Sequence, residues 1–211
     1  MSIKMPYWPK EGIELFESSG SYYELAHFGW GNSETKFYGY IMGYKNAADI
    51  LVSNVKRKKD ISFTDTVIYP IIFLYRQFIE LSLKKIYFSY SHDTLKDKIK
   101  SIKEANHNLV RIWRIIKPRL LEYSSVNEKV DIENVEAYIV QYQDIDPNSV
   151  IYRYPIDKKL NTTIQNEKRL NLVKLSERIH ELESFFNGVE GKLSDILDFE
   201  SEMYQYFGET Q

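Results

Sequence analysis

Apolar residues recur three or four positions apart along most of the chain after residue 36. This spacing places them on one face of an α-helix, so it predicts helices rather than strands. Residues 150–154 alone read as extended, because Pro155 disfavours helical backbone in the residue before it. The predicted helices cover approximately residues 37–59, 66–90, 94–104, 107–123, 131–144, 166–186 and 192–207. The pattern therefore predicts an all-α protein of six or seven helices.

The segment 66–90 is the most apolar of these, and hydrophobic residues surround nearly the whole of its predicted helix. A helix that is apolar on all sides is typical of the centre of a bundle. Pro70 fits the first turn, where a missing amide hydrogen costs little. We therefore expect a helical bundle around this long central apolar helix, residues 66–90.

Turn-forming residues divide the chain into three parts. Residues 1–36 contain two prolines and four glycines, which predict an irregular N-terminal segment. Residues 37–187 hold the predicted bundle, in which Asn106 is the expected cap of helix 107–123. The pair Asn187-Gly188 is expected to end helix 166–186. Residues 188–211 would then form a separate acidic amphipathic helix.

Composition removes several classes of protein. The chain of 211 residues has no cysteine, which excludes disulfides, thiolate nucleophiles and cysteine-type zinc sites. The N-terminal residues lack an apolar signal core, and the longest apolar run, residues 71–75, is too short to span a bilayer. Phosphate-binding loops, hydrolase elbows and zinc-protease motifs are absent from the sequence. We expect a cytoplasmic protein without membrane association, metal or cofactor.

Charge is distributed unevenly along the chain. Residues 54–119 contain 15 Lys or Arg against 6 Asp or Glu, whereas residues 177–211 contain 9 acids against 2 bases. One interpretation is that the acidic end docks on the basic region, within one chain or across a dimer. The other is that the basic region 54–119 binds RNA.

Polar residues inside the apolar helix are the first candidates for a site. Arg76, Gln77, Glu80 and Lys84 fall within an arc of about 100° on a helical wheel. Arg76 and Glu80 are four residues apart, so they can pair along one face. Such a pair is either structural or a polar groove in which Arg76 binds a phosphate and Glu80 orients it.

Two further residues join this list. His107 opens the predicted helix 107–123, where it is either a surface histidine or a general acid or base. Arg153 lies between Tyr152 and Tyr154, a setting that suits stacking or a buried salt bridge. Glu80 is the expected structural partner of Arg153, and the alternative is that Arg153 binds substrate beside Arg76.

Together these segments resemble the HEPN-type helical domains of bacterial defence systems. The resemblance covers residues 37–187 and lies in the string Tyr75-Arg76-Gln77-Phe78-Ile79-Glu80-Leu81, in His107-Asn108-Leu109 followed by Trp113, in Tyr152-Arg153-Tyr154-Pro155, and in the long helix near Asn171. It implies a bundle that commonly dimerises and, in many members, a metal-independent RNase of a toxin–antitoxin or antiviral system. The usual RNase motif of that superfamily, Arg followed four to six residues later by His, is absent from this sequence.

The resemblance leaves two functions open. In an RNase, His107 would act as base or acid, Arg76 and Arg153 would hold the phosphate, and Glu80 would orient Arg76. In the alternative the chain is a non-catalytic helical interaction module, such as an antitoxin, an immunity factor or a scaffold subunit. Convergence of Arg76, His107 and Arg153 in an open cleft would favour chemistry, and burial of the arginines with Glu80 would favour the module.

Overall fold

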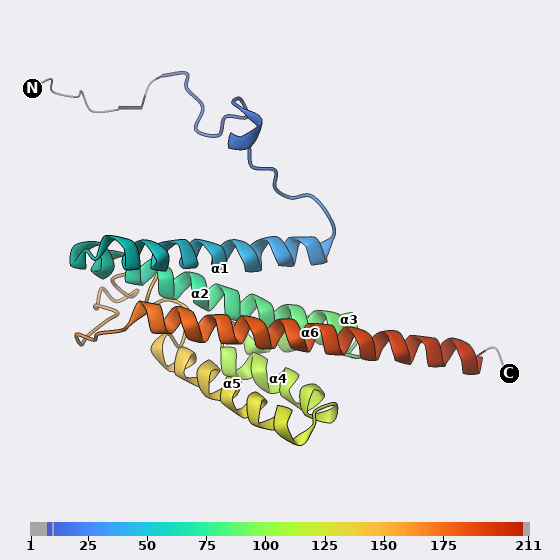
Figure 1. The fold of residues 1–211 in the computed structure, drawn as a ribbon. Helices are drawn as coiled ribbons and strands as arrows, with labels where there is room; N and C mark the ends of the chain where they lie inside the picture. Colours follow the sequence, from blue (N-terminus) through green and yellow to red (C-terminus); the bar gives the residue numbers. More distant parts are fainter. Residues whose placement is uncertain (1–7, 10, 209–211) are drawn as a thin grey trace, which may run out of the picture.

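The structure, a computed structural model, describes residues 8–9 and 11–208. These residues form six α-helices (Figure 1): α1 Ser33–Lys58, α2 Ile61–Tyr90, α3 Leu95–Ala105, α4 Leu109–Glu122, α5 Val126–Ile145 and α6 Leu172–Gly208. The described residues contain no β-strand, and one isolated antiparallel bridge joins Ile156 to Thr162. The predicted all-α bundle is therefore confirmed.

Helix α2 is the centre of the bundle. It packs against α1, α4 and α6, and α5 packs against α4. Its apolar residues are buried on several sides, which explains why the sequence of this helix is apolar all round. Among the described helices α2 is also long and apolar enough to cross a membrane by length and composition, a test that core helices of soluble proteins pass too.

Helix α2 begins at Ile61, five residues before the predicted start. The carboxylate of Asp60 accepts a hydrogen bond from the amide of Phe63 at 3.2 Å and so caps this earlier start. Pro70 consequently lies in the interior of the helix, and the prediction that it occupies the first turn is wrong. Its exposed position lets the helix continue, although Pro70 has no amide hydrogen for the carbonyl of Thr66.

Two other helix starts differ from the sequence prediction. Asn108, not Asn106, caps α4, because its side-chain oxygen accepts from the amide of Arg111 at 2.9 Å. Asn106 instead ends α3 with a φ of 53° and a ψ of −128°, a positive-φ backbone that residues other than glycine rarely adopt. Helix α5 starts at Val126, five residues before the predicted start, because Ser125 and Glu128 form a capping box.

Helix α6 runs without interruption from Leu172 to Gly208, so the prediction that Asn187-Gly188 ends a helix is wrong. Phe186 and Leu193 on either side of this pair are buried in the core. Their burial outweighs the cost of about 1 kcal/mol for glycine in a helix. The boundary predicted at residue 188 therefore falls inside α6, and residues 209–211 of the predicted last segment lie outside the described residues.

The predicted extended segment 150–154 is a turn. The amides of Arg153 and Tyr154 both donate to the carbonyl of Val150, at 3.0 and 3.1 Å. Asp146 supports this turn, because its carboxylate oxygen Oδ1 accepts from the amides of Val150 and Ile151 at 2.8 and 3.1 Å. The side chain of Asp146 thus overrides the local preference for extended backbone.

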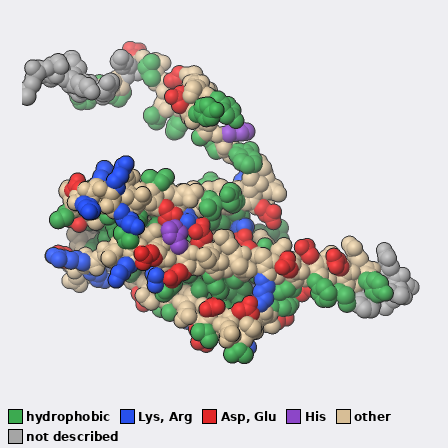
Figure 2. Space-filling view, viewed as in Figure 1, with side chains coloured by type: hydrophobic (Ala, Val, Ile, Leu, Met, Phe, Trp, Pro, Cys, Tyr) green, Lys and Arg blue, Asp and Glu red, His purple; other side chains and the backbone are tan. Residues whose placement is uncertain are grey.

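Two extensions leave the bundle (Figure 1). The N-terminal arm, residues 8–32, contains only the short 3-10 turn Tyr22–Glu24, and residues 1–7 and 10 of the predicted irregular segment lie outside the described residues. The projecting end, residues 197–208, is the last part of α6, and after the contacts of Glu200 with His92 and Arg119 it continues past the other helices. Figure 2 shows hydrophobic side chains along both extensions. Tyr23 on the arm is 96% exposed and Tyr204 on the projecting end is 82% exposed.

Candidate functional site

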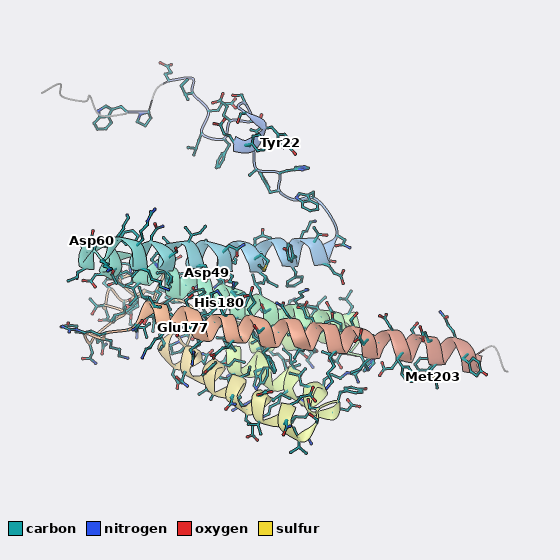
Figure 3. The ribbon with its side chains drawn as sticks, viewed as in Figure 1. Tyr22, Asp49, Asp60, Glu177, His180 and Met203 are labelled. Carbon is teal, nitrogen blue, oxygen red and sulfur yellow. The ribbon has the colours of Figure 1, made fainter. Side chains whose placement is uncertain are left out.

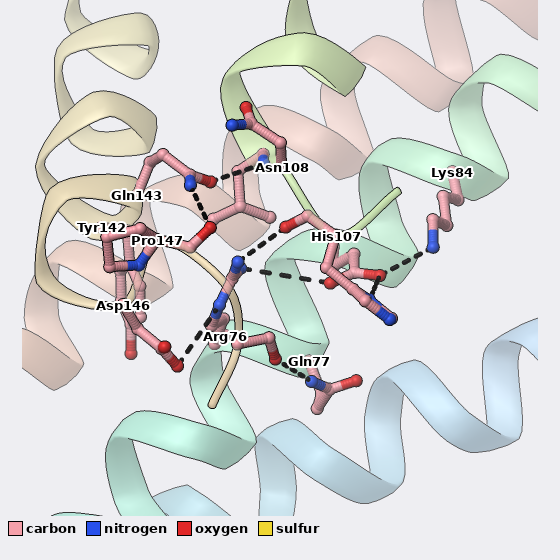
Figure 4. Close-up of polar contacts among 12 residues, drawn as sticks. Arg76, Gln77, Lys84, His107, Asn108, Tyr142, Gln143, Asp146 and Pro147 are labelled. Atoms are coloured by element: carbon pink, nitrogen blue, oxygen red, sulfur yellow. Dashed lines mark hydrogen bonds and ion pairs between the residues drawn. The ribbon is translucent and has the colours of Figure 1, made fainter. Parts of the chain in front are cut away.

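The middle of α2 carries a buried arginine whose charge is balanced by one carboxylate of the same helix and one from the end of α5 (Figure 4). Arg76 is 0% exposed, and its Nη2 donates to the carbonyl oxygen of His107 at 2.6 Å. Its Nη1 lies 4.0 Å from Glu80 Oε2, and its Nε lies 3.5 Å from Asp146 Oδ2. The predicted pair between Arg76 and Glu80 thus exists, and Asp146 completes it.

Glu80 is buried as well, and its carboxylate is shared. Oε1 accepts from Lys84 Nζ at 2.7 Å and lies 2.9 Å from His107 Nδ1. Burial opposes ionisation of Glu80, but the hydrogen bonds and charges of Lys84 and His107 outweigh it, so the pKa lies below its ordinary value. Glu80 therefore remains a carboxylate in the folded protein down to acidic pH.

His107 lies in the connection between α3 and α4 rather than in the first turn of a helix. Its carbonyl bonds to Arg76 and its ring to Glu80, so this residue contacts both members of the predicted pair. The ring is half-exposed, at 49%. We name Arg76, Glu80, His107 and Asp146 the Arg76 cluster.

Arg153 does not join the Arg76 cluster. Its Nε donates to the carbonyl of Ser149, and its guanidinium lies 5.8 Å from the ring centroid of Phe73 and 5.7 Å from that of Tyr154. Among the described ion pairs none connects Arg153 to Glu80, so that expected salt bridge is wrong. Stacking on aromatic rings, the other expectation for Arg153, is what the structure shows.

Sequence reasoning missed two members of the surrounding network. Asp146 is 0% exposed, although its sequence, Asp-Pro-Asn-Ser, indicates only a surface turn. Gln143 is buried one turn earlier, where it accepts from the amide of Leu109 at 2.7 Å and donates to the carbonyl of Pro147 at 2.6 Å. An acid at a predicted helix end, directly before proline, was the available signal for Asp146.

The Arg76 cluster is matched in charge but incompletely hydrogen-bonded. Arg76 Nε and Nη1, Glu80 Oε2 and Asp146 Oδ2 are buried without a hydrogen-bond partner, and they face one another at ion-pair distances. Burial lowers the pKa of Arg76, and the two carboxylates oppose that change. With no exposed surface the guanidinium has no contact with solvent, so it is placed to hold α2, α5 and the α3–α4 connection together.

A second polar network joins α1, α2 and α6, and the sequence analysis did not anticipate it. Lys45, 6% exposed, lies 2.9 Å from Asp49 and 2.8 Å from Glu183. Tyr75 donates to Asp49 at 2.7 Å, and His180 Nε2 lies 3.3 Å from the same carboxylate (Figure 3). Burial would lower the pKa of Lys45, but the two carboxylates outweigh it and the pKa is raised.

Comparison of the chain with protein-family models, with curated proteins and with solved structures finds no match. In the part of the chain that the structure describes, no group of three or more His, Asp or Glu side chains is placed to hold a metal ion. Function must therefore be argued from the geometry of the Arg76 cluster and from the exposed surfaces.

Proposed function

We propose that this protein is a non-catalytic helical interaction module, of the kind that serves as an antitoxin, an immunity factor or a scaffold subunit. The burial of Arg76 supports this proposal, because a guanidinium with no exposed surface cannot reach a substrate phosphate. The three other members of the Arg76 cluster hold its guanidinium inside the fold. Arg153, which would complete a phosphate clamp, points elsewhere.

The observation that carries the proposal is the apolar surface of the N-terminal arm. Large hydrophobic side chains are exposed along its whole length: Trp8, Ile13, Leu15, Phe16, Tyr22, Tyr23, Leu25, Phe28 and Trp30 are each 45–96% exposed. Many large apolar side chains exposed on one segment are typical of a surface that contacts another protein. The bundle would then be the rigid support from which the arm reaches its partner.

The arm gives a direct test. We expect affinity isolation of the full chain from its native host to recover a stoichiometric protein partner. The triple substitution Leu15→Ser, Phe16→Ser and Tyr23→Ser should remove that partner, whereas Lys158→Ser with Lys159→Ser on the exposed loop before α6 should keep it. A wild-type chain that recovers no partner and is toxic when expressed alone would contradict the proposal.

A metal-independent RNase of the HEPN type is the second candidate, and the geometry of His107 favours it. A half-exposed imidazole whose Nδ1 faces a buried carboxylate is oriented as a general base. Lys84, beside the same carboxylate and 17% exposed, would replace Arg76 as the phosphate partner. His107 would take the proton of a ribose 2′-hydroxyl, whose oxygen would attack phosphorus and expel the 5′-oxygen. The 5′-oxygen would take up a proton from water, which leaves a 2′,3′-cyclic phosphate and a 5′-hydroxyl end.

The two candidates separate in one assay. Incubation of the purified chain with RNA should leave it intact if the module proposal is correct. Cleavage that disappears in His107→Ala and in Lys84→Ala, while Arg153→Ala retains it, would establish the RNase instead. Growth and RNA integrity in a bacterial host expressing wild type and His107→Ala provide the same comparison in cells.

A further inference from the structure

The projecting end of α6 carries an apolar seam with acids on one side. Ile196, Phe199 and Met203 follow the 3–4 spacing of a coiled-coil seam, and Phe199 is 63% exposed. An exposed acid immediately precedes each seam residue: Asp195, Asp198 and Glu202. Among the described ion pairs none includes these three acids, whereas acids on the bundle side of α6 are paired, as Glu190 is with Lys85. Ile196 packs partly against the core, so Phe199 and Met203, with the acids beside them, are the part of the seam that is open to a helix of opposite charge.

Helix α3 has the complementary pattern. Leu95, Ile99 and Ile102 follow a 4–3 spacing; Leu95 and Ile99 are 70% and 42% exposed, whereas Ile102 packs partly against the core. An exposed lysine immediately follows each of them: Lys96, Lys100 and Lys103. No ion pair in the described part of the chain includes these lysines. In heptad terms Lys96 and Lys103 occupy e positions and Asp195 and Glu202 occupy g positions, which face each other when two helices run parallel. Lys100 and Asp198 lie further from the seam, at b and c, and add to the net charge of each helix.

The direction of the helices decides whether this match can be made. Helices α2 and α6 run the same way, because Lys85 pairs with Glu190 and His92, just beyond α2, lies 3.6 Å from Glu200. Helix α3 runs antiparallel to α2. Lys98 near its start donates a hydrogen bond to the carbonyl of Phe88, and His107 just after its end contacts Glu80, further back along α2. Within one chain α3 and α6 are therefore antiparallel, and their charged flanks do not meet.

A second copy related by a two-fold axis across α6 reverses this relation. Its α6 is antiparallel to the first α6 and hence parallel to the first α3. Helix α3 and the projecting end lie at the same end of the bundle (Figure 1), and His92 at the start of α3 lines a shared pocket with Leu197 and Tyr204. Two copies meeting at this end place each projecting end along the other copy's α3.

We propose that the chain forms a two-fold homodimer in which the acidic seam of α6, residues 195–203, packs in parallel against the basic seam of α3, residues 95–103, of the second copy. The inference rests on the proposed interaction function and names a second copy as one partner. Each interface is about 12–16 Å long at the helical rise, and the dimer contains two of them. The net charge of each seam makes the contact dependent on salt.

Charge reversal tests the pairing. We name the variant Lys96→Glu, Lys100→Glu, Lys103→Glu the α3 reversal, and Asp195→Lys, Asp198→Lys, Glu202→Lys the α6 reversal. Light scattering after size exclusion should show a wild-type dimer, and each reversal alone should lose at least about tenfold in dimer affinity because its facing seams carry like charge. Mixing the two reversals should restore a 1:1 dimer, because both interfaces of that heterodimer pair opposite charges.

Matched variants keep the result specific. Lys56→Glu, Lys59→Glu and Lys129→Glu change the same number of exposed lysines elsewhere and should leave the dimer intact. Circular dichroism verifies folding, and if a reversal does not fold, Phe199→Ser carries the test and should weaken the dimer. A monomeric wild type, a mixture that stays monomeric, or reversals that dimerise like wild type would overturn this inference. Those results would not contradict the proposed interaction function. RNA cleavage that depends on His107 would contradict that function instead.

Discussion

Replacing Arg76 with methionine should reveal what the Arg76 cluster contributes to stability. Methionine keeps most of the buried volume but removes the only positive charge that faces both Glu80 Oε2 and Asp146 Oδ2 among the described ion pairs. A unit charge pair at 3.5 Å, the separation of Arg76 Nε and Asp146, interacts by about 5 kcal/mol at an effective dielectric constant of about 20. Removing one partner of a buried pair typically costs about 3–5 kcal/mol.

The expected loss lies at the lower end of that range. Glu80 keeps Lys84 and His107 as partners, and Asp146 keeps two backbone amides. We therefore expect Arg76→Met to lower the free energy of unfolding by about 3 kcal/mol. Urea denaturation followed by circular dichroism measures it, and an unchanged dependence on urea would show that the unfolding transition is the same.

Arg153→Met is the matched control, because this arginine is exposed and its aromatic contacts are loose. It should change stability by no more than about 0.5 kcal/mol. Asp146→Asn should cost less in the Arg76→Met background than in wild type, by at least about 1 kcal/mol, because the two residues interact directly. Equal losses for Arg76→Met and Arg153→Met, or a loss below about 1 kcal/mol for Arg76→Met, would refute the assignment of Arg76 to the fold.

Three further changes have definite expected outcomes. Lys45→Met should lower the free energy of unfolding by about 1–3 kcal/mol, because it leaves Glu183 without its 2.8 Å partner; thermal unfolding measures this loss, and no change would contradict it. The lowered pKa of Glu80 means that its stabilisation is complete above its ordinary value of 4.5 and is lost as the pH falls through the lower folded value. Urea midpoints between about pH 3 and 6 should therefore fall less steeply with acid in Glu80→Gln than in wild type. Pro70→Ala should stabilise the protein by up to about 3 kcal/mol, because the new amide can donate a hydrogen bond to the carbonyl of Thr66, and a lower melting temperature would argue against this.

The helices of the fold were predictable where buried apolar residues recur in the sequence at helical spacing. The apolar circumference of α2 identified the central helix, and the spacing of Arg76 and Glu80 identified their pairing. Helix ends were less predictable, because several Asn, Ser and Asp residues can cap and only tertiary packing selects among them. Gly188 shows the same limit, since its own preference is small compared with the burial of Phe186 and Leu193 beside it.

The candidate site was predictable only in part. His107 contacts Glu80, another of the candidate residues, but its position in the α3–α4 connection depends on the positive-φ backbone of Asn106. Asp146 lies 70 residues from Arg76 in sequence, and no local pattern reveals a pairing over that separation. The predicted salt bridge between Arg153 and Glu80 was wrong for the same reason. A turn held by Asp146 directs the side chain of Arg153 toward Phe73.

The uninterrupted course of α6 gives the molecule a mechanical property. Its 37 residues form one rod of about 55 Å, with no hinge between the projecting end and the part that holds Glu183 against Lys45. A sideways force on residues 197–208 therefore acts as torque on that contact rather than being absorbed by a loop. Tilting of the rod would change the environment of Tyr75, which shares the carboxylate of Asp49 with Lys45. The hydrogen bond of Tyr75 would therefore report a contact made by the projecting end.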